Sequence, residues 1–186
     1  MADGRAERSA QLSEDEIVAA ALRLARSQGL TNLTMRSLAR ELGVTPMAAY
    51  HYVASKEALL TLVTDTALAA IAPIDADAAD WRAELSRWAL DFWDTLRQYP
   101  GLGAVVLQQG VGDLSTEHPA IALLVRSGFH RRDAVMAWAT YQTYVMGRLV
   151  LEASGRGSRV AGINARDFVE YGIETITAGM DAPRSR

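Results

Sequence analysis

Residues 34–60 read TMRSLARELGVTPMAAYHYVASKEALL, and this stretch decides the fold. Thr34 can cap a short helix, Met35 to Leu42, because a threonine hydroxyl accepts a hydrogen bond from an early helical amide. Gly43 ends that helix, since glycine adopts positive φ without steric cost. Thr45-Pro46 then begins a second short helix, where proline at the first helical position loses no needed hydrogen bond. Two short helices joined by a tight turn with glycine are typical of a helix-turn-helix.

The residues on either side complete a small helical head. Ser13 and Glu16 form a capping box, which predicts a helix from Ser13 to Gln28 that Gly29 ends. Ser55 can cap a fourth helix with an apolar side. We therefore expect a three-helix helix-turn-helix domain over residues 1–56.

The rest of the chain also has helical periodicity, and no segment alternates with the period of a strand. We expect an all-α fold of about nine helices, in which residues 57–186 form a larger ligand-binding and dimerisation body. Helices of the body are predicted over 81–99, 120–129, 132–153 and 165–180, and a short apolar segment is predicted over 102–109.

Charge is unevenly distributed along the chain. The net charge is -3, yet residues 17–56 hold five basic residues and one acidic residue, whereas residues from 57 onward hold 12 basic and 16 acidic residues. Phosphate binding depends on the local patch, so a basic head on an acidic body suits a nucleic-acid partner.

Several classes of protein are disfavoured by the composition. The chain has no cysteine, which excludes disulfides, thiolate zinc sites and cysteine nucleophiles. We find no metal-ligand spacing, no glycine-rich phosphate loop and no apolar run long enough to span a bilayer. We therefore expect a cytoplasmic protein that is not an enzyme, has no cofactor or metal, and does not contact a membrane.

The residues of the motif resemble those of the TetR (tetracycline-repressor) family. The resemblance rests on Gly43-Val44, Tyr50-His51-Tyr52, Lys56 and Leu59-Leu60, and it covers about the first third of the chain. It implies a dimeric, ligand-responsive transcription regulator that binds a palindromic DNA operator, most simply as a repressor that a small hydrophobic or aromatic ligand releases. The sequence does not fix the sign of regulation, so an activator stays open.

The same resemblance implies a set of DNA-binding residues. Lys56 is expected to bind a phosphate at the start of the fourth helix, where the helix dipole helps. Tyr50 and Tyr52 are expected to touch the backbone or a thymine methyl group, although one of them is expected to be partly core. Residues 45–48 hold no Arg, Asn or Gln for bidentate base readout. Specificity would then rest on Arg36, Thr45 and His51, on apolar contacts and on DNA shape. The full set is Thr34, Arg36, Thr45, Pro46, Met47, Ala48, Tyr50, His51, Tyr52 and Lys56.

The body holds an aromatic stripe that predicts a small-molecule site, because such sites are mostly apolar with few polar groups. Gln108 and Gln142 are the polar candidates, and ordinary core packing is the alternative for each residue. No histidine occurs near 104–107, where the drug-binding members of the family hold a metal–drug complex, so we do not expect tetracycline–magnesium as the ligand. The candidate ligand residues are Trp88, Phe92, Leu96, Leu107, Gln108, Met136, Tyr141 and Tyr144.

The helix over 132–153 is apolar nearly all the way round, so it must be buried on more than one side, and the helix over 165–180 is a second candidate for a subunit interface. Two helices from each subunit would make a four-helix interface in a homodimer. A dimer would place two recognition helices about 34–36 Å apart, one per half-site. The alternative function is a ligand- or protein-binding helical module without operator-specific DNA binding.

Overall fold

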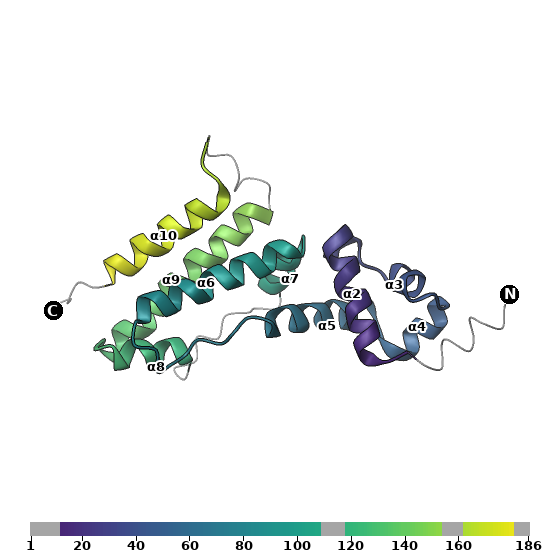
Figure 1. The fold of residues 1–186 in the computed structure, drawn as a ribbon, viewed down its shortest axis with the longest axis horizontal. Helices are drawn as coiled ribbons and strands as arrows, with labels where there is room; N and C mark the ends of the chain where they lie inside the picture. Colours follow the sequence, from purple (N-terminus) through teal and green to yellow (C-terminus); the bar gives the residue numbers. More distant parts are fainter. Residues whose placement is uncertain (1–11, 109–117, 154–161, 181–186) are drawn as a thin grey trace. The chain divides into compact units, whose positions relative to one another are not determined.

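The computed structural model describes residues 12–108, 118–153 and 162–180. Over these residues all regular secondary structure is helical, which confirms the all-α prediction (Figure 1). None of the described helices is long and apolar enough to cross a membrane. The nine α-helices and one 3-10 helix of the described residues are α2 (Glu14–Gln28), η1 (Leu30–Asn32), α3 (Met35–Leu42), α4 (Pro46–Tyr52), α5 (Lys56–Ala69), α6 (Trp81–Gln98), α7 (Leu102–Gln108), α8 (Pro119–Arg126), α9 (Arg131–Ala153) and α10 (Ala165–Gly179).

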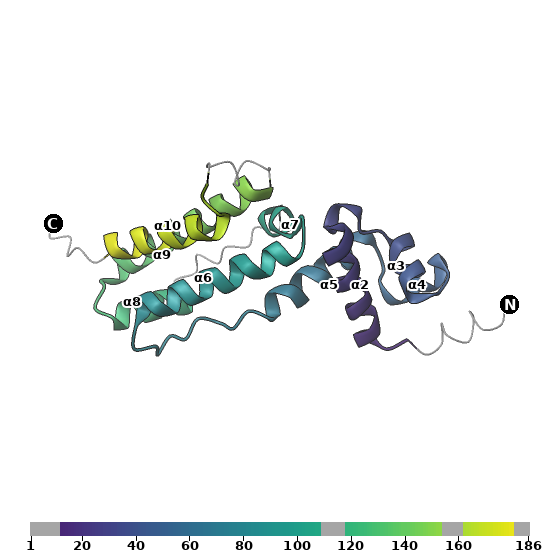
Figure 2. The ribbon, with the colours of Figure 1, turned by 45° about the horizontal axis from the view of Figure 1, so that its top comes forward.

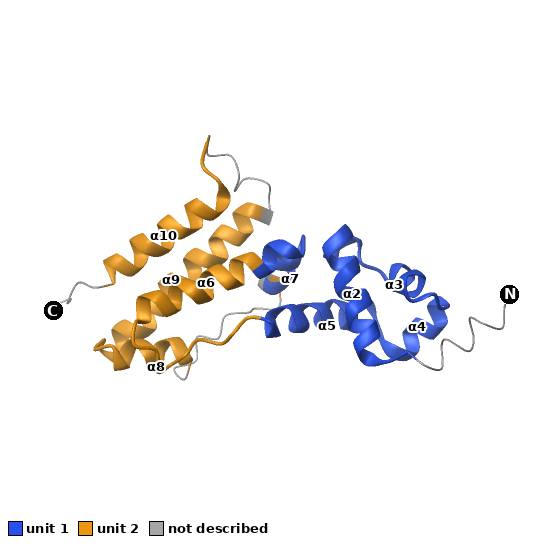
Figure 3. Ribbon diagram, in the orientation of Figure 1, with its two compact units in different colours: residues 1–70, 95–106 blue, residues 71–94, 107–186 orange. Residues whose placement is uncertain are grey.

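The chain divides into two compact units (Figure 3). The head unit comprises the chain up to Ala70 together with Thr95–Val106, and the body unit comprises Ile71–Asp94 together with the chain from Leu107 onward. The head unit is larger than residues 1–56 because α5 packs on α2. Helix α6 contributes residues to both units, since the division falls after Asp94.

Side-chain caps fix where the helices of the head begin. Ser13 and Glu16 form the predicted capping box, in which the amide of Ser13 donates to the Glu16 carboxylate at 2.8 Å. Thr34 forms a second box with Ser37, whose hydroxyl accepts from the amide of Thr34 at 3.0 Å. Gly43 closes α3 in the left-handed conformation with φ 71°. These contacts set the register of the helix-turn-helix.

Small side chains bring the helices of the head close together. Ala20, Ala21 and Ala25 are fully buried on α2, which packs against both α3 and α5. Ala39 is also buried, and its small side chain lets α3 and α4 pack closely. Larger apolar side chains fill the remaining core of the unit, namely Leu30, Leu33, Leu38, Val53, Leu59 and Val63.

The turn between α6 and α7 is fastened to the end of α2 within the head unit. The amide of Leu30 donates to the Pro100 carbonyl at 2.8 Å, and the Arg26 guanidinium donates to the Tyr99 hydroxyl at 2.9 Å. Gly29 has φ 77° and ψ 159°, and a Cβ at this position would lie 3.0 Å from the Pro100 oxygen. Only glycine fits this backbone conformation and this close approach together.

In the body unit α6 and α9 lie side by side in both views (Figures 1 and 2). The buried Tyr141 hydroxyl of α9 donates to the Leu85 carbonyl of α6 at 2.7 Å. Helix α10 packs on α9, where the Tyr144 hydroxyl donates to the Phe168 carbonyl at 3.1 Å. Gly172 allows this approach, since a Cβ there would overlap the Tyr144 hydroxyl.

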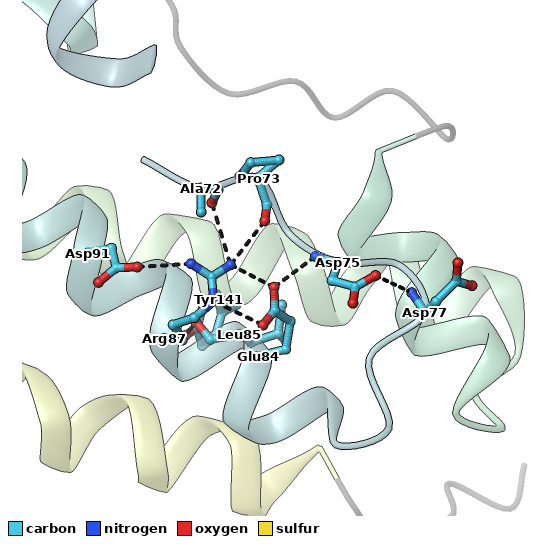
Figure 4. Close-up of polar contacts among 9 residues, drawn as sticks. All are labelled: Ala72, Pro73, Asp75, Asp77, Glu84, Leu85, Arg87, Asp91 and Tyr141. Atoms are coloured by element: carbon cyan, nitrogen blue, oxygen red, sulfur yellow. Dashed lines mark hydrogen bonds and ion pairs between the residues drawn. The ribbon is translucent and has the colours of Figure 1, made fainter. Parts of the chain in front are cut away.

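Arg87 holds the segment before α6 against the helix (Figure 4). Its guanidinium donates to the carbonyls of Ala72 and Pro73 and to the carboxylates of Glu84 and Asp91. The hydrogen bond from Arg87 is the main reason that the pKa of Glu84 is lowered, and Glu84 in turn raises the pKa of Arg87. The ion pairs therefore stay charged, and they anchor the connection between α5 and α6 at its body end.

Candidate functional site

Helix α4 presents one face to solvent and packs the other inward. The Thr45 hydroxyl accepts from the Ala48 amide at 3.2 Å, which caps the helix at the residue the sequence predicts. Ala48 and Ala49 are buried against the rest of the head, whereas Met47 is 72% exposed and Tyr50 is 49% exposed. The outward face is therefore apolar and aromatic, with Pro46 exposed beside Met47.

One expectation about this helix is corrected. Ala48 was expected to bind DNA, but it is only 8% exposed and belongs to the inward face. It packs inward with Ala49, on a helix that contacts α3. One of Tyr50 and Tyr52 was expected to be partly core, and Tyr52, at 36% exposed, is the more covered of the two.

The start of α5 adds a cation beside this face. Lys56 is the first residue of α5 and is exposed, and Ser55 caps the helix by accepting from the Ala58 amide at 3.1 Å. The pKa of Glu57 is lowered, first by a hydrogen bond from its own backbone amide and then by the Ser55 hydroxyl. The amides at this end thus stabilise negative charge, which is what a phosphate oxygen would use.

The other predicted contact residues of the head are also placed on its surface. Thr34, Arg36, Thr45 and His51 are exposed, on α3, on α4 and at the residues that cap them. The hydroxyl of Thr34 is already used, because it accepts from the Ser37 amide at 3.0 Å. Apart from Ala48, the predicted DNA-binding residues thus share the exposed surface of one compact motif.

The body unit contains a cluster of aromatic rings, which we call the aromatic cluster: Trp88, Phe92, His118, Trp138 and Tyr141. Trp88 stacks on Phe92 with ring centroids 5.2 Å apart, and its ring meets Trp138 edge-on at 5.4 Å. The His118 ring stacks on the Trp138 ring with centroids 4.5 Å apart. Tyr141 lies 6.0 Å from Trp138 in a stacked orientation. Trp88 is only partly buried, so the cluster is open to solvent at that ring.

The structure brings only part of the predicted ligand set together. Trp88, Phe92 and Tyr141 lie in the aromatic cluster, but Met136 is 55% exposed and Gln108 is exposed. The remaining predicted residues lie elsewhere. Leu96 belongs to the head unit, and the Tyr144 hydroxyl donates to a carbonyl of α10. The side chain of Leu107 lies outside the described residues. Of the two glutamines, only Gln142 is buried.

Comparison with known proteins gives the family. The family described as "Bacterial regulatory proteins, tetR family" matches residues 17–63, which hold the helix-turn-helix. The tetracycline repressor protein class A from transposon 1721 of Escherichia coli is 31% identical over 150 residues, which are 78% of this chain and 69% of that protein. This chain belongs to the tetR family.

Other proteins are similar to this chain over most of its length. An HTH-type transcriptional repressor of Mycobacterium tuberculosis is 30% identical over 160 residues, and the match covers 81% of this chain and 61% of that protein. The crystal structure of BioQ from Mycobacterium smegmatis matches with a TM-score of 0.68 and 29% identity, over 91% of this chain and 98% of that one. A TetR variant from Acinetobacter baumannii in complex with minocycline matches with a TM-score of 0.71 and 27% identity, over 95% and 100% of the two chains.

Three contacts of this tetR-family chain were not predicted. The capping partner Ser37 has a sequence signal, because it stands three residues after Thr34 as the last member of a capping box does. His118 also has one, since it precedes Pro119 and an apolar run and caps α8 by accepting from the Ala120 amide at 3.2 Å. The contact between Gly29 and Pro100 has none, because 71 positions separate the two residues along the chain.

Proposed function

We propose that this protein is a homodimeric transcription regulator that binds an operator through α4 and responds to a small aromatic ligand in its body. The observation that carries the proposal is the exposed face of α4, where Met47 and Tyr50 project from a helix whose inward side is closed by alanines. Apolar and aromatic side chains that gather on one exposed face, unlike single exposed ones, are typical of a surface that binds a partner. A regulator of this kind acts on DNA inside the cell, so we assign it to the bacterial cytoplasm.

Within this proposal the exposed residues of the head divide by task. Lys56 neutralises a phosphate at the start of α5, and Arg36 and Thr34 approach the backbone from α3. Pro46, Met47, Tyr50 and Tyr52 meet the major groove, where thymine methyl groups are the apolar features. The complete outward set is Thr34, Arg36, Thr45, Pro46, Met47, Tyr50, His51, Tyr52 and Lys56.

The exposed ridge of α9 supports a dimer. Five exposed residues recur along it at intervals of four and three, which is the spacing of a helix that packs against another helix. Tyr171 on α10 is 71% exposed, and α10 packs beside α9. Two such helices from each subunit would bury these side chains in a four-helix interface. The ridge consists of Met136, Thr140, Thr143, Gly147 and Val150.

Helix α6 supports a route from ligand to DNA. Trp88 and Phe92 stand in the body unit, whereas Tyr99 and Pro100, directly after the helix, bind Arg26 and Leu30 in the head unit. A ligand that prefers one position of α6 would therefore favour one state of the head, by no more than its difference in affinity for the two states.

The decisive experiment selects binding sites for the full chain from random duplex DNA and sequences the bound fraction. A dimeric operator binder would enrich a pseudo-palindrome whose half-sites are one helical turn apart, and its affinity would fall steeply as salt rises. A folded dimer that enriches no sequence at low salt would contradict operator binding and favour a helical module that binds ligand or protein. A reporter gene placed behind the selected site would then give the sign of regulation.

A further inference from the structure

The indole N–H of Trp138 is a buried donor without an acceptor. Trp138 is 0% exposed at the centre of the aromatic cluster, and no acceptor in the described part of the chain lies within hydrogen-bonding distance of its Nε1. The polar groups beside it are used elsewhere: the His118 Nδ1 accepts from the Ala120 amide, and the Tyr141 hydroxyl donates to the Leu85 carbonyl. Most buried polar groups have a partner, so a donor left without one in a closed protein is costly.

We propose that the aromatic cluster binds a planar aromatic effector that carries a carbonyl or quinone oxygen, and that this oxygen accepts from the Trp138 Nε1. The inference rests on the proposed function, because it names the chemical class of ligand to which the regulator responds. It assigns Trp138, absent from the predicted ligand residues, as the residue that determines specificity.

The arrangement of the rings selects for a flat ligand. Trp88 and Phe92 are close to parallel, with 13° between their planes, and His118 and Trp138 are also close to parallel at 24°. Within each pair the facing sides of the rings are already in contact, so a flat ligand would stack on their outer faces, where offset stacking between π-systems favours a planar ring system over an aliphatic chain. Partial exposure of Trp88 gives the ligand an edge of the cluster to enter.

The N–H selects for oxygen on that ligand. A purely hydrocarbon ring would bury Trp138 again without an acceptor, whereas a carbonyl oxygen in the ring plane would complete its hydrogen bond. A site that holds a donor discriminates strongly against a ligand that lacks the matching acceptor, since the donor is then left unpaired.

Two probes of the same shape test this selection: anthraquinone-2-sulfonate and anthracene-2-sulfonate, which differ only in the two carbonyl oxygens. Binding of each to the full chain is measured by isothermal titration calorimetry. We expect the quinone to bind about tenfold more tightly, a ratio that corresponds to about 1.4 kcal/mol. In Trp138→Phe the ratio should fall to about one, because the ring remains and the donor is gone.

Trp81→Phe is the matched control. Trp81 is also a buried tryptophan of the body, 6% exposed, but it packs edge-on against Phe129 at 5.3 Å, outside the cluster. This variant should keep the tenfold ratio. Equal affinity of the wild type for the two probes, an unchanged ratio in Trp138→Phe, or no binding of the quinone would each overturn the proposal.

A spectroscopic measurement on the wild type covers the case in which Trp138→Phe does not fold. The chain has four tryptophans, so its indole N–H groups give a simple proton–nitrogen spectrum. A new hydrogen bond moves an indole proton downfield, and we expect one signal to do so with the quinone probe and none with the hydrocarbon probe. Downfield movement with neither probe would refute the assignment.

Failure here is distinguishable from failure of the proposed function. If random DNA yields an operator but the two probes bind equally, only the ligand class is wrong. If no operator is found while the Trp138-dependent preference for the quinone holds, the proposed regulation of DNA is wrong and the binding site stands.

Discussion

Replacing Gly29 with alanine tests how firmly the turn after α6 is fastened to the head. Gly29 precedes Leu30, whose amide donates to the Pro100 carbonyl, and its own backbone lies at φ 77° and ψ 159°. Side chains other than hydrogen are strained in this region, where a non-glycine residue costs about 1–3 kcal/mol. The added methyl group would also stand 3.0 Å from the Pro100 oxygen.

The size of the effect follows from these two contacts. If the methyl group displaces Pro100, the hydrogen bond from Leu30 is lost, at a net cost of about 0.5–1.5 kcal/mol. Alanine also reduces the entropy of the unfolded chain, which offsets about 0.4–1 kcal/mol. We therefore expect Gly29→Ala to lower the free energy of unfolding by about 2–3 kcal/mol.

Urea unfolding followed by circular dichroism, at one fixed protein concentration, measures this loss. Gly128→Ala is the control, because Gly128 also has positive φ, at 99°, but nothing lies within 4 Å of the Cβ position. It should lose only the strain, offset by the same entropic gain, which leaves about 1 kcal/mol. The reasoning about the turn is refuted if Gly29→Ala unfolds within about 0.5 kcal/mol of the wild type, or no more easily than Gly128→Ala.

Three further substitutions test other parts of the molecule. Lys56→Gln should weaken operator binding and reduce the slope of log affinity against log salt by about one, measured by fluorescence anisotropy; an unchanged slope would remove Lys56 from the phosphate contacts. Met136→Glu should give a monomer in light scattering, while Val125→Glu, which changes an exposed residue of α8, should stay dimeric; a dimer in both would place the interface elsewhere. Tyr141→Phe should cost about 1 kcal/mol, because it removes the hydrogen bond to Leu85. Burial raises the pKa of Tyr141, so the wild type should lose stability as pH rises above about 10, where the unfolded tyrosine ionises, and the variant should lose less; equal pH profiles of the two in urea unfolding would count against this cause.

Local signals predicted the head well because each has a local physical cause. The cap at Thr45 and the left-handed Gly43 are both where the sequence places them, since a cap or a positive φ depends on a few neighbouring residues. The faces of α4 were harder, because a helix of seven residues with two adjacent alanines can be rotated without a large change in apolar pattern. Packing against α3 decides that Ala48 faces inward, and that is a tertiary contact.

The ligand residues were the least predictable for the same reason. The stripe of α6 indicated Trp88 and Phe92, and both lie in the aromatic cluster, but Trp138, which meets Trp88 edge-on, stands 50 positions further along the chain. Met136 and Trp138 stand two positions apart on α9, and only the position of the neighbouring helices decides that Met136 is exposed while Trp138 is buried.

The buried donor of Trp138 and the fastened turn after α6 together suggest why a regulator would keep both features. A donor without an acceptor makes the ligand-free cluster less stable than the same cluster with an oxygen in place, so an effector that supplies the oxygen gains affinity only for the arrangement that presents Trp138 to it. Trp88, on α6, forms one side of that arrangement, and the residues that follow the same helix bind Arg26 and Leu30 in the head. A loose turn would absorb a displacement of α6, whereas a turn held by two hydrogen bonds and a glycine contact would pass it on. In the regulator proposed above, the unpaired donor at Trp138 and the close contact at Gly29 would both serve a ligand-dependent change in DNA affinity.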